Sequence, residues 1–61
     1  MTDYERDIMR HLNGEDVPGL SWGAAMGEAL EFLRGDGYVR QRAGRYELTD
    51  EGRRALDAVR G

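Results

Sequence analysis

The chain has 61 residues, with twelve acidic and nine basic side chains, a single histidine and no cysteine. A chain of this length forms one domain, residues 1–61, and buries only about 60% of the surface that its unfolded form exposes. The composition excludes a disulfide framework and a thiolate metal site, and one histidine cannot form a metal centre alone. With no apolar run of about 20 residues and no basic, apolar leader, we expect a cytoplasmic protein without a membrane partner.

The first predicted helix has a start signal, an apolar face and a stop signal. Thr2 is followed three residues later by Glu5, a spacing that allows each side chain to cap the other residue's backbone. Apolar residues then recur every fourth position, which predicts a helix over residues 3–12. Asn13-Gly14 follows and favours termination, because glycine takes the left-handed conformation at low cost. The predicted inner face consists of Tyr4, Ile8 and Leu12.

The second predicted helix is the longest and is separated from the first by a broken segment. Residues 15–20, EDVPGL, contain the only proline and a glycine, so they predict a loop with apolar anchors rather than a helix. We expect Ser21 to cap a helix that extends to Arg34. Its apolar side chains form one broad arc that should contact both the first helix and the hairpin. They are Trp22, Ala25, Met26, Ala29, Leu30, Phe32 and Leu33.

A β-hairpin follows the turn at residues 35–37. Residues 38–42 and 45–48 are rich in aromatic, β-branched and long side chains, which predicts two strands with Tyr46 and Leu48 facing inward. A three-residue loop, Arg42 to Gly44, with Gly44 in the left-handed conformation would connect them. This hairpin contains the only basic cluster of the chain, Arg40, Arg42 and Arg45.

The last predicted helix begins directly after the hairpin. Thr49 is expected to cap it, and two acidic residues follow in the first turn, where they favour the positive end of the helix dipole. We expect Gly52 to let the helix start close to the hairpin. The predicted inner stripe is Gly52, Ala55, Leu56 and Val59.

These elements predict a mainly α domain with a β-hairpin, in the order helix, helix, strand, strand, helix. An apolar helix, Gly-Tyr-Val, a short arginine-bearing hairpin and the motif YELTDEGR at residues 46–53 follow one another. This pattern resembles the wing and following helix of winged-helix transcription regulators of the MarR and PadR type. The resemblance covers residues 22–59 and, more loosely, the first thirteen residues. Residues 15–20 have no room for the second helix of a complete helix-turn-helix.

The resemblance implies DNA binding in a regulatory role. Arg40, Arg42 and Arg45 would contact phosphates, and Arg34 would be the only residue suited to approach base edges. The outer face of the second helix, which would be the recognition helix, departs from the pattern because it is small and acidic, and glutamates repel phosphates.

A protein-interaction or dimerisation module is the alternative that the sequence leaves open. In this interpretation the small, acidic face of the second helix docks against a protein partner or a second copy. We expect no enzyme, cofactor, metal or small-molecule substrate, because no nucleophile has a base and an orienting acid, and no glycine loop could hold a phosphate. The residues of the interaction face are Gly23, Ala24, Gly27, Glu28 and Glu31.

Overall fold

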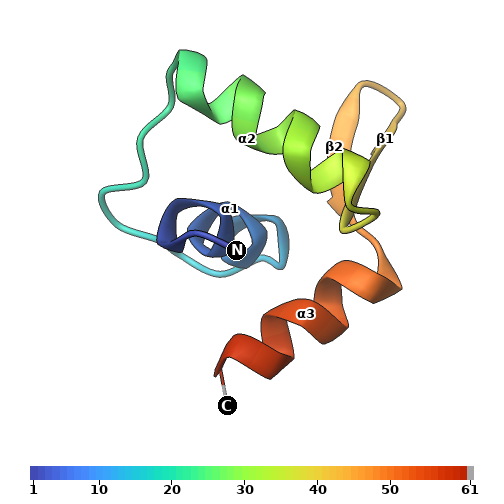
Figure 1. Cartoon of the computed structure of the whole chain (residues 1–61). Coiled ribbons are helices and arrows are strands. Elements are labelled where there is room, and N and C mark those ends of the chain that lie inside the picture. Colours follow the sequence, from blue (N-terminus) through green and yellow to red (C-terminus); the bar gives the residue numbers. More distant parts are fainter. Residues whose placement is uncertain (61) are drawn as a thin grey trace.

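The computed structural model describes residues 1–60, which form three helices and one antiparallel hairpin (Figure 1). Their order, helix, helix, strand, strand, helix, confirms the fold class predicted from the sequence. None of the helices in residues 1–60 has the length and apolar character needed to cross a bilayer. The elements are α1 (Asp3–Leu12), α2 (Ala24–Gly35), β1 (Val39–Arg42), β2 (Arg45–Leu48) and α3 (Asp50–Arg60).

The ends of α1 are where the sequence signals placed them. The Thr2 hydroxyl accepts a hydrogen bond from the Glu5 backbone N–H at 3.1 Å, and the Glu5 carboxylate accepts one from the Thr2 N–H at 2.8 Å. Asn13 caps the other end, and Gly14 follows with φ of +86°. The predicted capping box and helix stop are therefore confirmed.

The linker between α1 and α2 contains no helix, as predicted, but α2 begins later than expected. Its N-cap is Gly23, with extended backbone and no side-chain cap, so the prediction that Ser21 caps the helix is wrong. The Tyr4 hydroxyl in α1 donates a hydrogen bond to the Ser21 carbonyl at 2.8 Å. This tertiary contact ties the linker to α1 and competes with an earlier start of α2.

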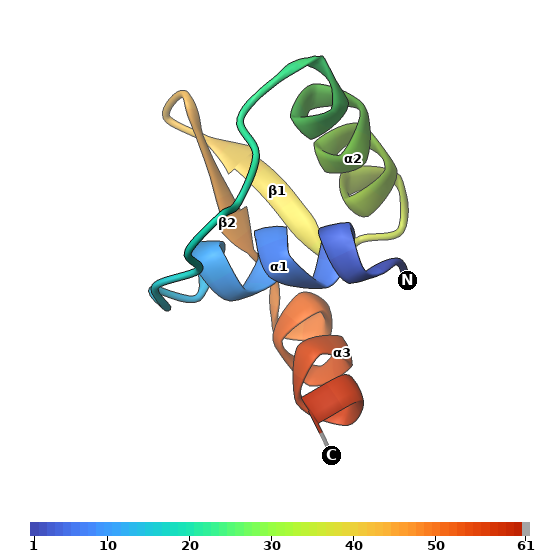
Figure 2. The ribbon, with the colours of Figure 1, turned by 90° about the vertical axis from the view of Figure 1, so that its left-hand side faces the viewer.

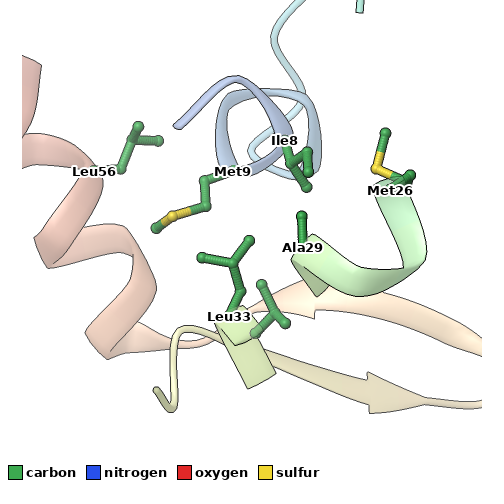
Figure 3. Close-up of a cluster of buried hydrophobic side chains, with 7 residues drawn as sticks. Ile8, Met9, Met26, Ala29, Leu33 and Leu56 are labelled. Carbon is green, nitrogen blue, oxygen red and sulfur yellow. The ribbon is translucent and has the colours of Figure 1, made fainter. Parts of the chain in front are cut away.

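The hydrophobic core lies where α1, α2, β1 and α3 meet (Figure 3). Met9 is fully buried and lies between the three helices, although the sequence pattern left it out of the inner face. Because α1 is covered by α2 on one side and α3 on another, it buries two adjacent rows of side chains instead of one. Each large buried side chain contributes about 1.5–3 kcal/mol of transfer free energy. The buried residues are Ile8, Met9, Met26, Ala29, Leu33, Val39 and Leu56.

Three large side chains predicted to be inside are exposed. Trp22 and Phe32 are 66% and 71% exposed, and Val59 is 49% exposed. Trp22 precedes α2, and Phe32 lies on a flank of α2 that the start of α1 covers only in part. Val59 lies in the last turn of α3, one turn beyond the buried Leu56. Ala25 is also exposed, so the broad apolar arc of α2 narrows to a stripe with one side open.

The hairpin pairs its strands in the register Val39 with Leu48 and Arg42 with Arg45. Ala43 and Gly44 form a two-residue turn with φ of +52° and +76°, so the predicted three-residue loop is wrong. Positive φ at both central residues matches the right-handed twist of the strands, which favours this shorter connection. The inner face is as predicted, with Tyr46 and Leu48 packed against the core.

The base of the hairpin is joined to the first turn of α3. The Thr49 hydroxyl accepts a hydrogen bond from the Gly52 N–H at 3.0 Å and donates one to the Gly37 carbonyl at 2.5 Å. The Thr49 N–H donates to the Tyr38 carbonyl at 3.0 Å. A Cβ on Gly52 would collide with this same carbonyl group. The structure thus confirms both the cap and the close approach that the sequence predicted for Thr49 and Gly52.

Glu15 connects the linker to both neighbouring helices. Its carboxylate accepts hydrogen bonds from the Asn13 amide at 3.2 Å and the Arg10 Nε at 3.3 Å, and Arg60 of α3 approaches both oxygens, at 2.8 and 3.0 Å. The Asn13 amide, then the Arg10 hydrogen bond and the charges of Arg60 and Arg10, hold the pKa of Glu15 below its ordinary value of 4.5, against an opposing effect of desolvation. This partly buried carboxylate therefore stabilises the folded chain while it is ionised.

Substitution of two glycines should separate close packing from helix propensity. Gly52→Ala forces the backbone of Tyr38 away from α3 and should cost about 1–3 kcal/mol or more, a large part of the stability of so small a domain. Gly27→Ala is the control, since a Cβ there meets nothing within 4 Å, and it should raise stability by up to about 1 kcal/mol. Urea unfolding followed by circular dichroism measures both. Wild-type stability of Gly52→Ala would show that α3 does not dock this closely.

Acid should remove the stabilisation that Glu15 supplies. Because its pKa is lower in the folded chain than in the unfolded chain, the contribution is present above the ordinary pKa and is lost as the pH falls through the folded value. Glu15→Gln should therefore be less stable than wild type at about pH 7, and the difference should shrink by about pH 3. Glu28→Gln, a change at an exposed carboxylate, should alter stability little. A difference for Glu15→Gln that stays constant with pH would contradict this role.

Candidate nucleic-acid interface

The hairpin tip carries two arginines that face each other. Arg42 and Arg45 are cross-strand partners at the last paired position before the turn, and both are exposed. Within residues 1–60 no carboxylate forms an ion pair with either guanidinium. Like charges directly opposite on a sheet repel each other, so an anion placed between them would relieve this repulsion. The two guanidinium groups at the tip are therefore available to an anion.

The other two arginines predicted to bind DNA are already paired. Arg40 contacts Glu47, its cross-strand neighbour, at 3.2 Å, and Arg34 contacts Glu31, one turn earlier in α2, at 2.7 Å. Both pairs are exposed, so each is worth about 0–1 kcal/mol and a phosphate would have to compete with it. Of the four arginines predicted to bind DNA, the two at the hairpin tip thus have no ion pair within residues 1–60, and the other two are paired with glutamates.

The outer face of α2 is small and acidic, as the sequence indicated. Ala24, Gly27, Glu28 and Glu31 are all exposed on the helix. Gly23 is exposed too, but it precedes α2 as the N-cap and does not belong to the helical face as predicted. This face opposes phosphate, and Arg34 beside it is held by Glu31.

A pocket of about 310 Å³ opens between α1, α2, β2 and the linker. Figure 2 shows the arrangement of these four segments. We name it the Trp22 pocket. The Trp22 ring meets the His11 ring edge to face, with centroids 4.9 Å apart and planes at 82°. Sequence reasoning missed this site because it assigned Trp22 to the core, although Gly23 after it was a signal that the helix begins later. The lining residues are Ile8, His11, Leu12, Trp22, Met26, Leu30, Arg45 and Tyr46.

A second hollow, the Phe32 groove, lies on the opposite flank of α2, against the N-terminal half of α1. Apolar side chains form much of its surface, and the two charged residues that line it, Glu5 and Glu28, are both acidic. The two exposed aromatics of the chain thus have different surroundings, since the Trp22 pocket includes an arginine and the Phe32 groove includes glutamates. The lining residues of the groove are Thr2, Tyr4, Glu5, Ala25, Glu28, Ala29 and Phe32.

These surfaces carry arginine and aromatic side chains that can bind ligands. Arginine side chains hold anions, and exposed aromatic rings stack on planar ligands or pack against apolar side chains. Within residues 1–60 no three histidine, cysteine or acidic side chains are grouped so that they could hold a metal ion. Comparison with protein-family models, curated proteins and solved structures gives no match to this chain.

Proposed function

We propose that this chain is a reduced winged helix that binds nucleic acid through its hairpin, in a regulatory role. The observation that carries the proposal is the exposed cross-strand pair of Arg42 and Arg45, which has no ion-paired carboxylate within residues 1–60. The hairpin tip points away from α3 in both views of the molecule, so the tip is accessible to a long, rigid ligand such as duplex DNA (Figures 1 and 2).

The wing, and not α2, makes the proposed contact. In a complete winged helix the helix before the wing would enter the major groove, but α2 presents Glu28 and Glu31 there, which repel phosphates. Phosphate contacts position a protein on nucleic acid without reading its sequence. Binding should therefore be nearly independent of sequence and, with about two phosphate contacts, at the weak end of nonspecific affinities, with a dissociation constant of about 10⁻⁴ M.

Salt dependence should reveal the contribution of the hairpin tip. Replacing Arg42 and Arg45 together by alanine removes two phosphate contacts, so the slope of log K against log salt for mixed-sequence duplex DNA should become shallower by up to about two. Fluorescence anisotropy from about 50 mM salt upward measures this slope.

The matched control for the hairpin variant replaces Arg53 and Arg54, two exposed arginines of α3, by alanine. It changes the net charge equally and leaves the tip intact, so most of the wild-type slope should remain. An equal decrease of the salt slope in the two double variants would show that only net charge affects binding. Absence of wild-type binding at about 50 mM salt would refute the proposal.

Phe32 favours a second candidate function, a protein-interaction module. An aromatic side chain that is 71% exposed in the middle of a helix is a typical anchor for a partner, and Glu28 and Glu31 beside it would suit a partner with basic residues. Of the face predicted from the sequence, Gly23, Ala24, Gly27, Glu28 and Glu31, the last four lie on α2, and Phe32 adds an apolar side chain next to its glutamates.

Removing this ring should test the self-association form of the second candidate. Phe32→Ser should leave the fold nearly unchanged, because the ring is mostly in solvent, but should abolish any concentration-dependent dimer. Val59→Ser, at an exposed apolar residue of α3, is the control and should preserve the dimer. Sedimentation of wild type and both variants over a concentration series measures this. A wild-type monomer at millimolar concentration would rule out a dimer through this face.

A further inference from the structure

Trp22 is held in place although most of its surface is in solvent. The carbonyl of the preceding Ser21 accepts a hydrogen bond from Tyr4, and the indole ring meets His11 edge to face. An exposed ring that is fixed before a ligand arrives loses little conformational entropy on binding. Trp22 is therefore a preorganised platform for a planar ligand.

The Trp22 pocket has the lining that an unpaired nucleotide requires. Its floor is apolar, Tyr46 supplies a second aromatic ring, and Arg45 lies on its β2 side. Among residues 1–60, no carboxylate lines it. Its volume of about 310 Å³ is at the lower end of the range for ligand pockets, about 300–1,000 Å³, so it suits a single ring system rather than a helix.

Arg45 links this pocket to the proposed phosphate contact, because it lines the pocket and also faces Arg42 across the hairpin. We propose that the Trp22 pocket takes one unpaired base of a single strand whose phosphates lie on Arg42 and Arg45. The inference depends on the proposed nucleic-acid binding and specifies its form: single-stranded segments are preferred to duplex.

A duplex cannot use this pocket. Its bases are stacked on each other and present only their edges, whereas a base in a single strand exposes a face that can stack on an aromatic ring. Stacking of one base typically raises the affinity about tenfold. The duplex retains only the phosphate contacts at the hairpin tip, so the two ligands should differ by about this factor.

The experiment compares a short oligothymidylate with a mixed-sequence duplex of equal length at about 50 mM salt. Anisotropy of labelled ligand gives the affinities. Trp22 is the only tryptophan, so its fluorescence reports on the pocket directly. Wild type should bind the single strand about tenfold more tightly than the duplex, with quenching of Trp22 by the single strand only.

Three variants assign the effect to the pocket. Trp22→Ala should lower the affinity for the single strand about tenfold and leave the affinity for the duplex unchanged. Trp22→Phe should restore part of the affinity for the single strand. Arg45→Ala should lower the affinity for both ligands. Phe32→Ala is the control, because its ring is equally exposed but lies among glutamates, and it should leave both affinities unchanged. Circular dichroism melts establish that each variant is folded.

Three outcomes would overturn the inference. Equal affinity of wild type for duplex and single strand, without quenching, would refute the base site and leave the proposed duplex binding intact. Equal losses in Trp22→Ala and Phe32→Ala would show that the pocket has no special part in binding. Thymidine monophosphate that binds as tightly as the strand would assign the pocket to free nucleotides. If wild type binds neither ligand, the proposed function itself is refuted.

Discussion

One close contact, between the Tyr38 carbonyl and the first turn of α3, joins the base of the hairpin to the last helix. Gly52 permits this approach because it has no side chain, and Thr49 donates its N–H to the same carbonyl while its hydroxyl joins the helix start to Gly37. An isolated two-stranded hairpin is marginally stable in water. Its direction therefore has to be set by the elements around it. The junction with α3 fixes its base, Val39, Tyr46 and Leu48 pack on the core, and the tip points away from α3.

Sequence reasoning succeeded where a signal acts over a few residues. Thr2 and Glu5 define the start of α1, and Thr49 defines the start of α3, because a cap needs only its own side chain and the next turn of backbone. The close packing at Gly52 was also predictable, since close approach of another backbone is the main reason for a glycine on the inner face of a helix. At the candidate site, the strands and the two arginines at the hairpin tip were predicted for the same reason, since the strand pattern is local, although the turn is one residue shorter than predicted.

The wrong predictions concern which side chains are covered by other helices and strands, and no short sequence pattern specifies this. Periodicity placed Phe32 and Trp22 inside, but it did not show that Trp22 precedes α2 or that the neighbouring elements leave most of the Phe32 ring exposed. Met9 is buried because a second helix, α3, also packs against α1. The sequence also did not predict the ion pairs at the candidate site. Arg40 meets Glu47 only through the strand register, which neutralises an arginine that the sequence presents as part of a basic cluster.

A net charge of -3 does not decide what the hairpin tip can bind, because charge acts locally in salt. The molecule measures 29 × 25 × 19 Å, and the Debye length at 0.1 M salt is about 10 Å, so acids on distant faces are screened from the tip. At lower salt the screening length grows and the same acids repel a nucleic acid as it approaches. Salt therefore weakens the phosphate contacts and this repulsion together. The affinity of the whole protein then falls less steeply with salt than the number of phosphate contacts implies. A difference in salt slope between two variants of equal net charge still reports on the phosphate contacts alone.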